Sequence, residues 1–216
     1  MAEVNLLRSL PQSKRSIAAR ASAKTDDHVR ISRQYGLEYF DGQREYGYGG
    51  YSYDGRWVPV ASDIIAHFEL EPGDRVLDVG CAKGFLVKDL VDQGIDAYGL
   101  DVSSYALMNC LPEVVGRLHL GSAESLPFPD GSFKAVVSIN AIHNLPRDLC
   151  GEALREIERL APGRGFVQVD SYRDAAQKAA FEDWVLTAMF HGYPDEWTAL
   201  FGEVGYTGDW NWTIVD

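Results

Sequence analysis

Short apolar runs alternate along the chain with longer segments in which apolar residues recur every three or four positions. The runs predict strands at 75–79, 97–101, 117–120, 135–139, 166–170 and 207–215. The longer segments predict helices at 58–70, 84–93, 103–110, 147–161, 174–190 and 195–204. Strands that alternate with crossover helices favour an α/β fold, with a mostly parallel sheet covered by helices on both faces.

The N-terminal part of the chain departs from this alternation. Residues 12–34 have the spacing of one or two short amphipathic helices. Residues 35–57 hold six of the 11 tyrosines among several glycines, a pattern typical of neither a helix nor a buried strand. Glycines make an ordered free state costly and aromatic rings need a partner surface, so we expect a lid that orders over a bound ligand. The chain is thus predicted to be one domain, 1–216, with an N-terminal helical extension and Tyr-rich lid at 1–57 and a core at 58–216.

The first predicted strand runs into a turn that carries two glycines, Gly80 and Gly84. Gly80 permits close approach of a ligand to the backbone, and Gly84 permits tight contact between helix and strand. Asp78 lies inside this strand, and Asp101 ends the next one, 21 positions beyond Gly80. An acid at that strand end can bind both hydroxyls of a ribose. The pattern predicts a Rossmann-like domain that binds a nucleoside-containing ligand.

Five motifs in order resemble those of the class I S-adenosylmethionine-dependent methyltransferase family, of the small-molecule type. They lie at 76–86, 99–103, 121–128, 130–137 and 160–169, within a resemblance that covers about residues 60–206. The resemblance implies a soluble enzyme that binds S-adenosyl-L-methionine and transfers its methyl group in line to a small molecule. The tyrosine-rich segment is similar to that of bacterial methyltransferases of sugar and polysaccharide pathways, which favours a small polar, sugar-related acceptor.

The resemblance also implies which residues contact the cofactor. They are Asp78, Gly80, Cys81, Gly84, Asp101, Val102, Ser122, Ala123, Glu124 and Asn140. The first motif departs from the family because Ala82 and Lys83 replace the commoner small, glycine-rich residues. We interpret Cys81 as a small structural residue of this turn. A second departure is Ser122, which stands where many relatives carry an Asp toward the adenine amino group.

Candidate residues for the chemistry follow the fourth and fifth predicted strands, where Rossmann-like folds place their active sites. His143 is the candidate general base, because its unperturbed pKa of ~6.5 suits proton removal near neutrality. The alternative is that His143 hydrogen-bonds the following turn. Candidate acceptor-binding residues are Tyr48, Tyr51, Arg56 and Tyr172. No second carboxylate accompanies Asp170, so the sequence predicts no metal site.

Three other classes of protein stay open at this point. A NAD-dependent oxidoreductase also places an acid on a ribose, but it expects Gly-x-Gly-x-x-Gly, and Ala82 breaks that pattern. The same pocket would serve an enzyme that uses S-adenosylmethionine for other chemistry, such as cyclisation of its aminobutyrate arm. A catalytically silent binding module is the third. Formation of S-adenosylhomocysteine during turnover distinguishes methyl transfer from the last two.

Charge and composition narrow the set of partners. Residues 1–33 hold seven of the 20 Lys and Arg residues but three of the 32 Asp and Glu residues, which leaves a formal charge of −16 on the remainder. This acidic body argues against a nucleic-acid partner. No apolar run approaches the ~18 residues of a membrane helix. Three cysteines without metal-type spacing suit a reducing, cytoplasmic setting. We expect a small-molecule acceptor and leave the oligomeric state open.

Overall fold

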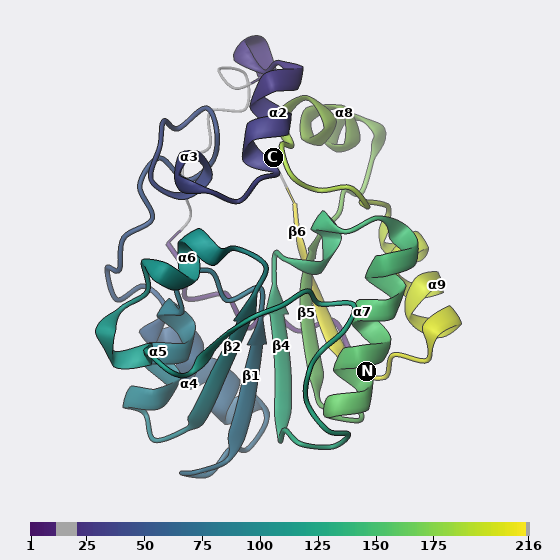
Figure 1. Cartoon of the computed structure of the whole chain (residues 1–216). Coiled ribbons are helices and arrows are strands. Elements are labelled where there is room, and N and C mark those ends of the chain that lie inside the picture. The colour runs from purple at the N-terminus through teal and green to yellow at the C-terminus, as the bar shows by residue number, and fades with distance from the viewer. Residues whose placement is uncertain (12–20, 215–216) are drawn as a thin grey trace.

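The computed structural model describes residues 1–11 and 21–214 and confirms the α/β, Rossmann-like fold (Figure 1). Within these residues, the strands form one sheet in the order β3-β2-β1-β4-β5-β6, and every neighbouring pair is parallel. The strands are β1 (Arg75–Val79), β2 (Asp96–Asp101), β3 (Leu118–Leu120), β4 (Ala135–Ile139), β5 (Gly165–Asp170) and β6 (Asp209–Thr213). The strand order reverses between β1 and β4, which is where doubly wound sheets bind their ligands.

Helices pack on both faces of the sheet (Figure 1). One face is covered by α4 (Val58–His67) and α5 (Phe85–Asp92), and the other by α7 (Arg147–Leu160) and α9 (Pro194–Val204). Alternate strand residues point to opposite faces, so Val76 packs with the first pair of helices and Leu77 with the second. The remaining elements are α2 (Asp26–Ser32), α3 (Leu37–Phe40), α6 (Ser104–Met108), α8 (Ala175–Trp184) and the 3-10 turns η1 (Pro112–Val114) and η2 (Ile142–Asn144).

Two elements near the C-terminus are shorter than the sequence pattern predicts. The helix expected over 174–190 ends at Trp184, and Val185 is already extended. The backbone N–H groups of Met189 and Phe190 donate to the carbonyl of His143 instead of continuing the helix. This tertiary contact overrides the local apolar spacing. The last strand begins at Asp209 rather than at residue 207, and it runs parallel to β5.

The N-terminal extension reaches both ends of the domain. The backbone of Val4 donates to Trp210, and Trp210 donates to Ala2, so the first residues pair with the edge strand β6. Helices α2 and α3 lie above the carboxyl ends of the strands (Figure 1). The helices predicted over 12–34 are confirmed at α2, while residues 12–20 lie outside the described residues.

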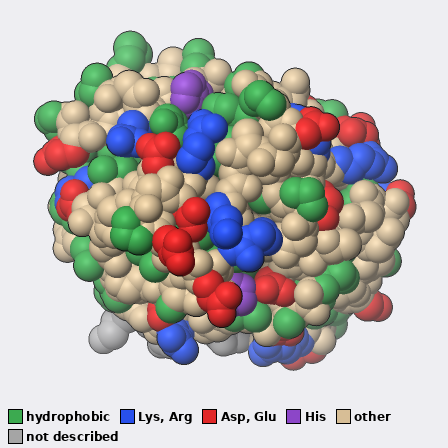
Figure 2. All heavy atoms as spheres, turned by 90° about the horizontal axis from the view of Figure 1, so that it is seen from below, with side chains coloured by type: hydrophobic (Ala, Val, Ile, Leu, Met, Phe, Trp, Pro, Cys, Tyr) green, Lys and Arg blue, Asp and Glu red, His purple; other side chains and the backbone are tan. Residues whose placement is uncertain are grey.

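The described helices are short, and charged side chains of both signs lie at the surface. No helix in residues 1–11 and 21–214 is long and apolar enough to cross a membrane. Figure 2 shows the face at the amino ends of the strands, where acidic and basic side chains are interspersed with hydrophobic ones.

Candidate functional site

A cavity of about 190 Å³ lies at the carboxyl ends of the strands, where the strand order reverses. Its lining residues come from the ends of β1, β2 and β4, from the segment after β3, and from the Tyr-rich segment. They are Tyr35, Tyr39, Phe40, Tyr48, Val79, Gly80, Ala82, Leu100, Asp101, Val102, Gly121, Ser122, Ala123, Ile139, Asn140, Ala141, Asn144 and Leu145. Six of the ten residues predicted to bind the cofactor are among them.

The turn after β1 is shaped by backbone conformations that favour glycine. Gly80 has a φ of 85°, and a Cβ there would lie 2.1 Å from the Cβ of Ala141. Gly84, at the start of α5, has a φ of 74° and packs against Leu118 of β3. Ala82 has a φ of 50° at the place of the missing glycine, so this turn keeps its left-handed backbone at some cost. The backbone of the turn is therefore free to approach a ligand.

Asp101 holds this turn and the start of α6 together. Its Oδ2 accepts from the backbone N–H of Ala82 at 2.7 Å, and its Oδ1 accepts from the N–H of Ser103 at 2.8 Å. Burial raises the pKa of Asp101, although these backbone hydrogen bonds oppose the rise. The carboxylate retains lone pairs for a ligand, since each oxygen accepts two hydrogen bonds or more. It lies in the cavity as a ribose-binding acid would.

Asp78 is buried at the end of β1, next to the lining residues Val79 and Gly80. It is 5% exposed, and none of the described residues donates a hydrogen bond to its carboxyl group. Burial, with a smaller contribution from Asp101, raises the pKa of Asp78 to about 7. A buried carboxyl group with no donor fits a positively charged group of a bound ligand.

Three other residues predicted to bind the cofactor have roles in the scaffold. Cys81 is buried against Gly99, where a Cβ would lie 2.6 Å from its Sγ, and this packing supports a structural role. Gly84 packs inside the protein, as described above. Glu124 accepts a hydrogen bond from Ser122, which itself lines the cavity with Ala123. This pair orients the segment after β3.

An aromatic wall, which is formed by Tyr35, Tyr39, Phe40 and Tyr48, closes the cavity on the side of the extension. Phe40 and Tyr48 stack with ring centroids 5.8 Å apart. Tyr39 packs edge to face on both of them. The sequence singled out Tyr48 but missed the other three rings. Their only signal was the density of tyrosines before the first strand.

Lys83 fastens the Tyr-rich segment to the cofactor turn. Its ammonium group lies 2.8 and 2.6 Å from the two carboxylate oxygens of Asp41 and 2.9 Å from the carbonyl of Tyr51. Asp41 also accepts from the hydroxyl of Tyr105 and the backbone of Tyr51. The Lys83 side chain is 9% exposed. The residue that departs from the family's first motif is thus an anchor for the segment over the cavity.

The structure does not place the other predicted acceptor-binding residues in the cavity wall. Tyr51 stacks on Phe85 at 4.7 Å, behind Tyr48. The guanidinium of Arg56 is half exposed and pairs with Asp54 instead of a ligand. Tyr172 is 3% exposed and packs with α8. Local partners hold the side chains of Arg56 and Tyr172 away from the cavity wall, and their role in acceptor binding stays a prediction.

His143 is buried at η2 and does not line the cavity. Its Nδ1 accepts from the backbone N–H of Asp170 at 3.0 Å, and its Nε2 lies 3.3 Å from the Asp170 carboxylate. Burial lowers the pKa of His143, with the Asp170 carboxylate opposing. A neutral ring that accepts at Nδ1 and donates at Nε2 has no lone pair left for a proton. The geometry favours a link between η2 and β5.

This role for His143 gives a testable result. We expect His143→Ala to lower the unfolding midpoint by several degrees, because the contacts of the buried ring with the backbone N–H and the carboxylate of Asp170 are lost. Turnover by the folded variant should fall less than about tenfold. A 10²–10⁴-fold fall in turnover (about the loss typical of an acid–base group) at unchanged stability would favour the general base instead.

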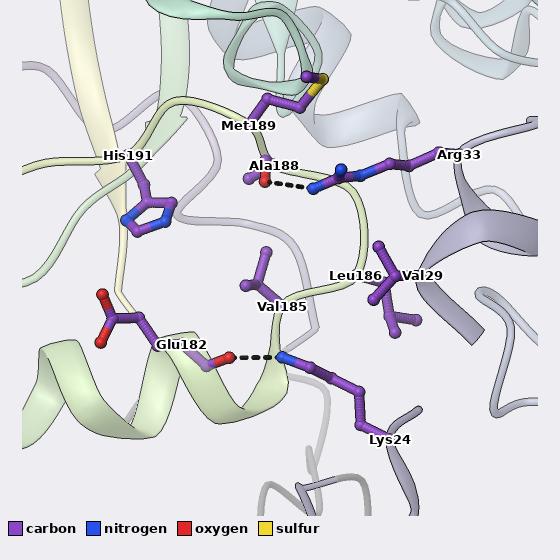
Figure 3. A pocket seen from close by; sticks show the side chains of 9 residues that line it. All are labelled: Lys24, Val29, Arg33, Glu182, Val185, Leu186, Ala188, Met189 and His191. Carbon is purple, nitrogen blue, oxygen red and sulfur yellow. Dashed lines mark hydrogen bonds between the residues drawn. The ribbon is translucent and has the colours of Figure 1, made fainter. Parts of the chain in front are cut away.

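A second hollow, of about 360 Å³, lies between α2 and the segment after α8 (Figure 3). Lys24 donates to the carbonyl of Glu182 there, and Arg33 donates to the carbonyl of Ala188. None of the residues that line this hollow also lines the cavity at the strand ends. The hydrogen bonds from Lys24 and Arg33 join the N-terminal extension to the segment around α8. Among the described residues, no group of three His, Cys, Asp or Glu side chains is placed to hold a metal ion.

These features form a cavity at the carboxyl ends of the strands of a Rossmann-like domain, and comparisons with known proteins show what the chain is similar to. Residues 77–169 match the family model described as a methyltransferase domain. An uncharacterized methyltransferase of Synechocystis sp. is 32% identical over 111 residues, covering 50% of this chain and 52% of the relative. The demethylmenaquinone methyltransferase of Symbiobacterium thermophilum is 30% identical over 150 residues, covering 63% of this chain and 58% of the relative. The chain spans about half the length of the curated relatives it matches.

Solved structures agree with the fold. A putative methyltransferase of Haloferax volcanii, in complex with the methyltransferase activator Trm112, has a TM-score of 0.54 and 26% identity, covering 67% of this chain and 66% of that chain. The YcgJ protein of Bacillus subtilis has a TM-score of 0.54 and 23% identity, covering 67% of this chain and 66% of that one, and shares the fold. Residues 77–169 thus match a methyltransferase domain, and the chain shares its fold with solved methyltransferases.

Proposed function

We propose that this protein transfers the methyl group of S-adenosyl-L-methionine to a small, uncharged acceptor. The observation that carries the proposal is the cavity at the reversal of strand order, where the Gly80 turn and the Asp101 carboxylate meet an aromatic wall. Members of the family use S-adenosylmethionine, and the motifs that bind it lie in the expected order along the cavity.

The residues present fit this cofactor. Asp101 would bind the ribose hydroxyls, and the segment from Gly121 to Ala123 would bind the adenine; both line the cavity, which supports these roles. The unpartnered carboxyl of Asp78 suits the ammonium group of the methionine part. When bound, the cofactor supplies a methyl group on a sulfonium sulfur. The protein's own share is to align the acceptor with that methyl and to exclude water.

The cavity wall also favours an uncharged acceptor. Asp101 is the one charged side chain among the described residues that line the cavity. An anionic acceptor would therefore have no counter-charge there, and the rings of Tyr39, Phe40 and Tyr48 offer apolar faces. The 2-methyl-6-phytyl-1,4-hydroquinone methyltransferase of Synechocystis sp., 32% identical over 127 residues that cover 49% of this chain and 40% of that protein, is named for an aromatic acceptor. The sugar-related acceptor stays a prediction.

The pKa of Asp78 predicts how cofactor binding depends on pH. At pH 6 the free protein holds a proton on Asp78, because its pKa is about 7. A bound ammonium group favours the carboxylate, so binding should release up to one proton at pH 6 and almost none at pH 8.5. Calorimetric titration in two buffers of different ionisation enthalpy measures this release. Asp78→Asn should abolish it, and equal apparent enthalpies in both buffers at pH 6 would refute it.

The direct test is an assay for S-adenosylhomocysteine. The protein is incubated with S-adenosylmethionine and, separately, with phenols, aliphatic alcohols, amines, carboxylic acids and sugars. We expect S-adenosylhomocysteine to form together with a methylated acceptor in at least one uncharged class. Consumption of S-adenosylmethionine without a methylated product would instead support cyclisation or another reaction of the aminobutyrate arm. Binding without turnover in any class would support the silent module.

A further inference from the structure

Asn140 stands at the carboxyl end of β4 in a conformation that non-glycine residues seldom adopt. Its φ is 54°, and its backbone N–H donates to the carbonyl of Gln168 at 2.9 Å. The four residues before Ile139 are fully buried, whereas Asn140 is exposed and lines the cavity. Strained backbone of this kind concentrates at functional sites, where the surrounding structure enforces it.

A chain of side-chain hydrogen bonds, the amide relay, crosses the sheet from β6 to Asn140. The amide nitrogen of Asn211 donates to Gln168 Oε1 at 3.2 Å, and Gln168 Nε2 donates to Thr213 Oγ1 at 3.0 Å. The hydroxyl of Thr213 then donates to Asn140 Oδ1 at 2.6 Å. Gln168 and Thr213 are both buried, so this chain is shielded from water.

The amide relay fixes which end of the Asn140 amide faces the cavity. A contact of 2.6 Å is short for an N–H···O bond but ordinary for O–H···O, whereas 3.0 Å suits N–H···O. The oxygen of Asn140 is therefore the atom that Thr213 holds. The NH₂ group of Asn140 is left as a donor, and none of the described residues accepts from it.

Asn144 adds an acceptor to the same cavity. It lies four residues further on, across η2, and its Oδ1 is buried with no partner among the described residues. A buried carbonyl oxygen without a donor costs free energy unless a ligand satisfies it. The cavity thus offers a donor from Asn140, and the amide of Asn144, whose oxygen no described residue holds, can turn that oxygen toward a ligand. A neutral hydroxyl group, which both accepts and donates, complements this pair.

The residues of the cavity wall favour a phenolic over an aliphatic hydroxyl group on the acceptor. Among the described lining residues the one carboxylate, Asp101, already holds Ala82 and Ser103, and burial raises the pKa of Tyr35 to about 12. No lining group is thus placed as a base for an aliphatic hydroxyl, whose pKa is near the 15.7 of water. A phenolic hydroxyl has a pKa of about 10 and ionises more readily when an N–H donates to its oxygen.

We propose that Asn140 and Asn144 bind a phenolic hydroxyl of the acceptor, and that Thr213 and Gln168 are positioning residues that hold the Asn140 NH₂ group toward it. This inference rests on the proposed function and deepens it. The phenol binds as the neutral molecule, with its O–H donating to Asn144 Oδ1. It then loses its proton to solvent, and the phenolate oxygen, which accepts from the Asn140 NH₂ group, attacks the methyl carbon. A C–O bond forms, the C–S bond breaks with its electron pair left on sulfur, and S-adenosylhomocysteine leaves.

The experiment compares Thr213→Val, Thr213→Ser and the wild type with phenol, 4-nitrophenol, hydroquinone, benzyl alcohol, benzylamine and benzoate. We expect the three phenols to be methylated, with a pH profile that follows the pKa of the phenol used. Thr213→Val should raise the KM for the phenols about tenfold or more and leave the Kd for S-adenosylhomocysteine within twofold. Thr213→Ser, which keeps the hydroxyl, should restore the KM. Thr198→Val, on the surface of α9, is the matched control.

Asn140→Ala and Asn140→Asp complete the test. Asn140→Ala should lower kcat/KM about 100-fold, and Asn140→Asp should lower it further, because a carboxylate repels the phenolate. An unchanged KM in folded Thr213→Val would overturn the role of the amide relay. Methylation of benzyl alcohol but of no phenol would overturn the acceptor class and leave the proposed function standing. Methylation of benzylamine or benzoate alone would overturn the acceptor class and also contradict the uncharged acceptor of the proposed function, while methyl transfer itself would stand. Cofactor binding with no phenol methylated would also overturn the acceptor class, whereas failure to bind S-adenosylmethionine would count against the proposed function itself.

Discussion

Replacing Asp101 by alanine should weaken binding of S-adenosylmethionine by roughly 30- to 150-fold, which corresponds to about 2–3 kcal/mol. Two effects combine in this loss. The ligand loses charged hydrogen bonds to its ribose, and the turn loses the carboxylate that accepts from Ala82 and Ser103. Calorimetric titration with S-adenosylhomocysteine measures the Kd, which reports the lost ribose contacts and the altered turn together.

Asp101→Asn and a control on the same strand separate these effects from general damage. The amide of Asp101→Asn would turn an NH₂ group toward one of the two backbone donors, so we expect a loss close to that of alanine. Asp96→Ala changes an acid at the opposite end of β2, where Asp96 pairs with Arg117, and should leave affinity unchanged. Wild-type affinity in folded Asp101→Ala would move the ribose away from this strand.

Asp41→Ala should release the Tyr-rich segment from the cavity. It leaves the buried ammonium of Lys83 with the carbonyl of Tyr51 as its one described partner, at a cost of roughly 3 kcal/mol. Hydrogen exchange across residues 35–57 should then quicken about 100-fold in the absence of ligand. The acceptor KM should rise with it, because the wall of Tyr39, Phe40 and Tyr48 is no longer held in place.

The pair is asymmetric, which gives this prediction a sharp control. The Asp41 side chain is 30% exposed and can be hydrated, whereas that of Lys83 cannot. Lys83→Met should therefore perturb the segment less than Asp41→Ala, and the double variant should recover part of the Asp41→Ala loss. Arg56→Ala alters an exposed pair in the same segment and should change nothing. If Asp41→Ala leaves exchange unchanged, Lys83 is no anchor.

The same exchange measurement tests whether the Tyr-rich segment is a lid. The structure shows it packed over the cavity, with Phe40 buried and Lys83 fastened to Asp41. We expect exchange across residues 46–57 to slow when S-adenosylhomocysteine is added. Equal and strong protection with and without the ligand would show a permanent wall.

Local patterns predicted the parts of the site that depend on the backbone. Gly80 and Asp101 were predicted because a turn and a strand end impose their residue types within a few positions. The strands β1 and β4 were predicted to the residue, since each is a short run rich in valine and other apolar residues. The last strand, β6, was predicted over 207–215 and is shorter in the structure, Asp209–Thr213.

Contacts between segments that are distant along the chain could not be predicted from the sequence. Lys83 was noticed as an unusual residue, but its partner Asp41 lies 42 positions earlier, and no periodicity links the two. His143 resembled a base because it follows β4, while the carboxylate and N–H of Asp170 that occupy its ring come from β5. The amide relay to Asn140 likewise draws on three strands that meet only in the fold.

The most direct test of the central claim is calorimetric titration of the protein with S-adenosylmethionine, S-adenosylhomocysteine and NAD. The turn at Gly80 and the acids Asp78 and Asp101 predict micromolar binding of both sulfur ligands, with one site per chain, and no detectable binding of NAD. Binding of NAD with neither sulfur ligand bound would contradict the assignment of this cavity to S-adenosylmethionine.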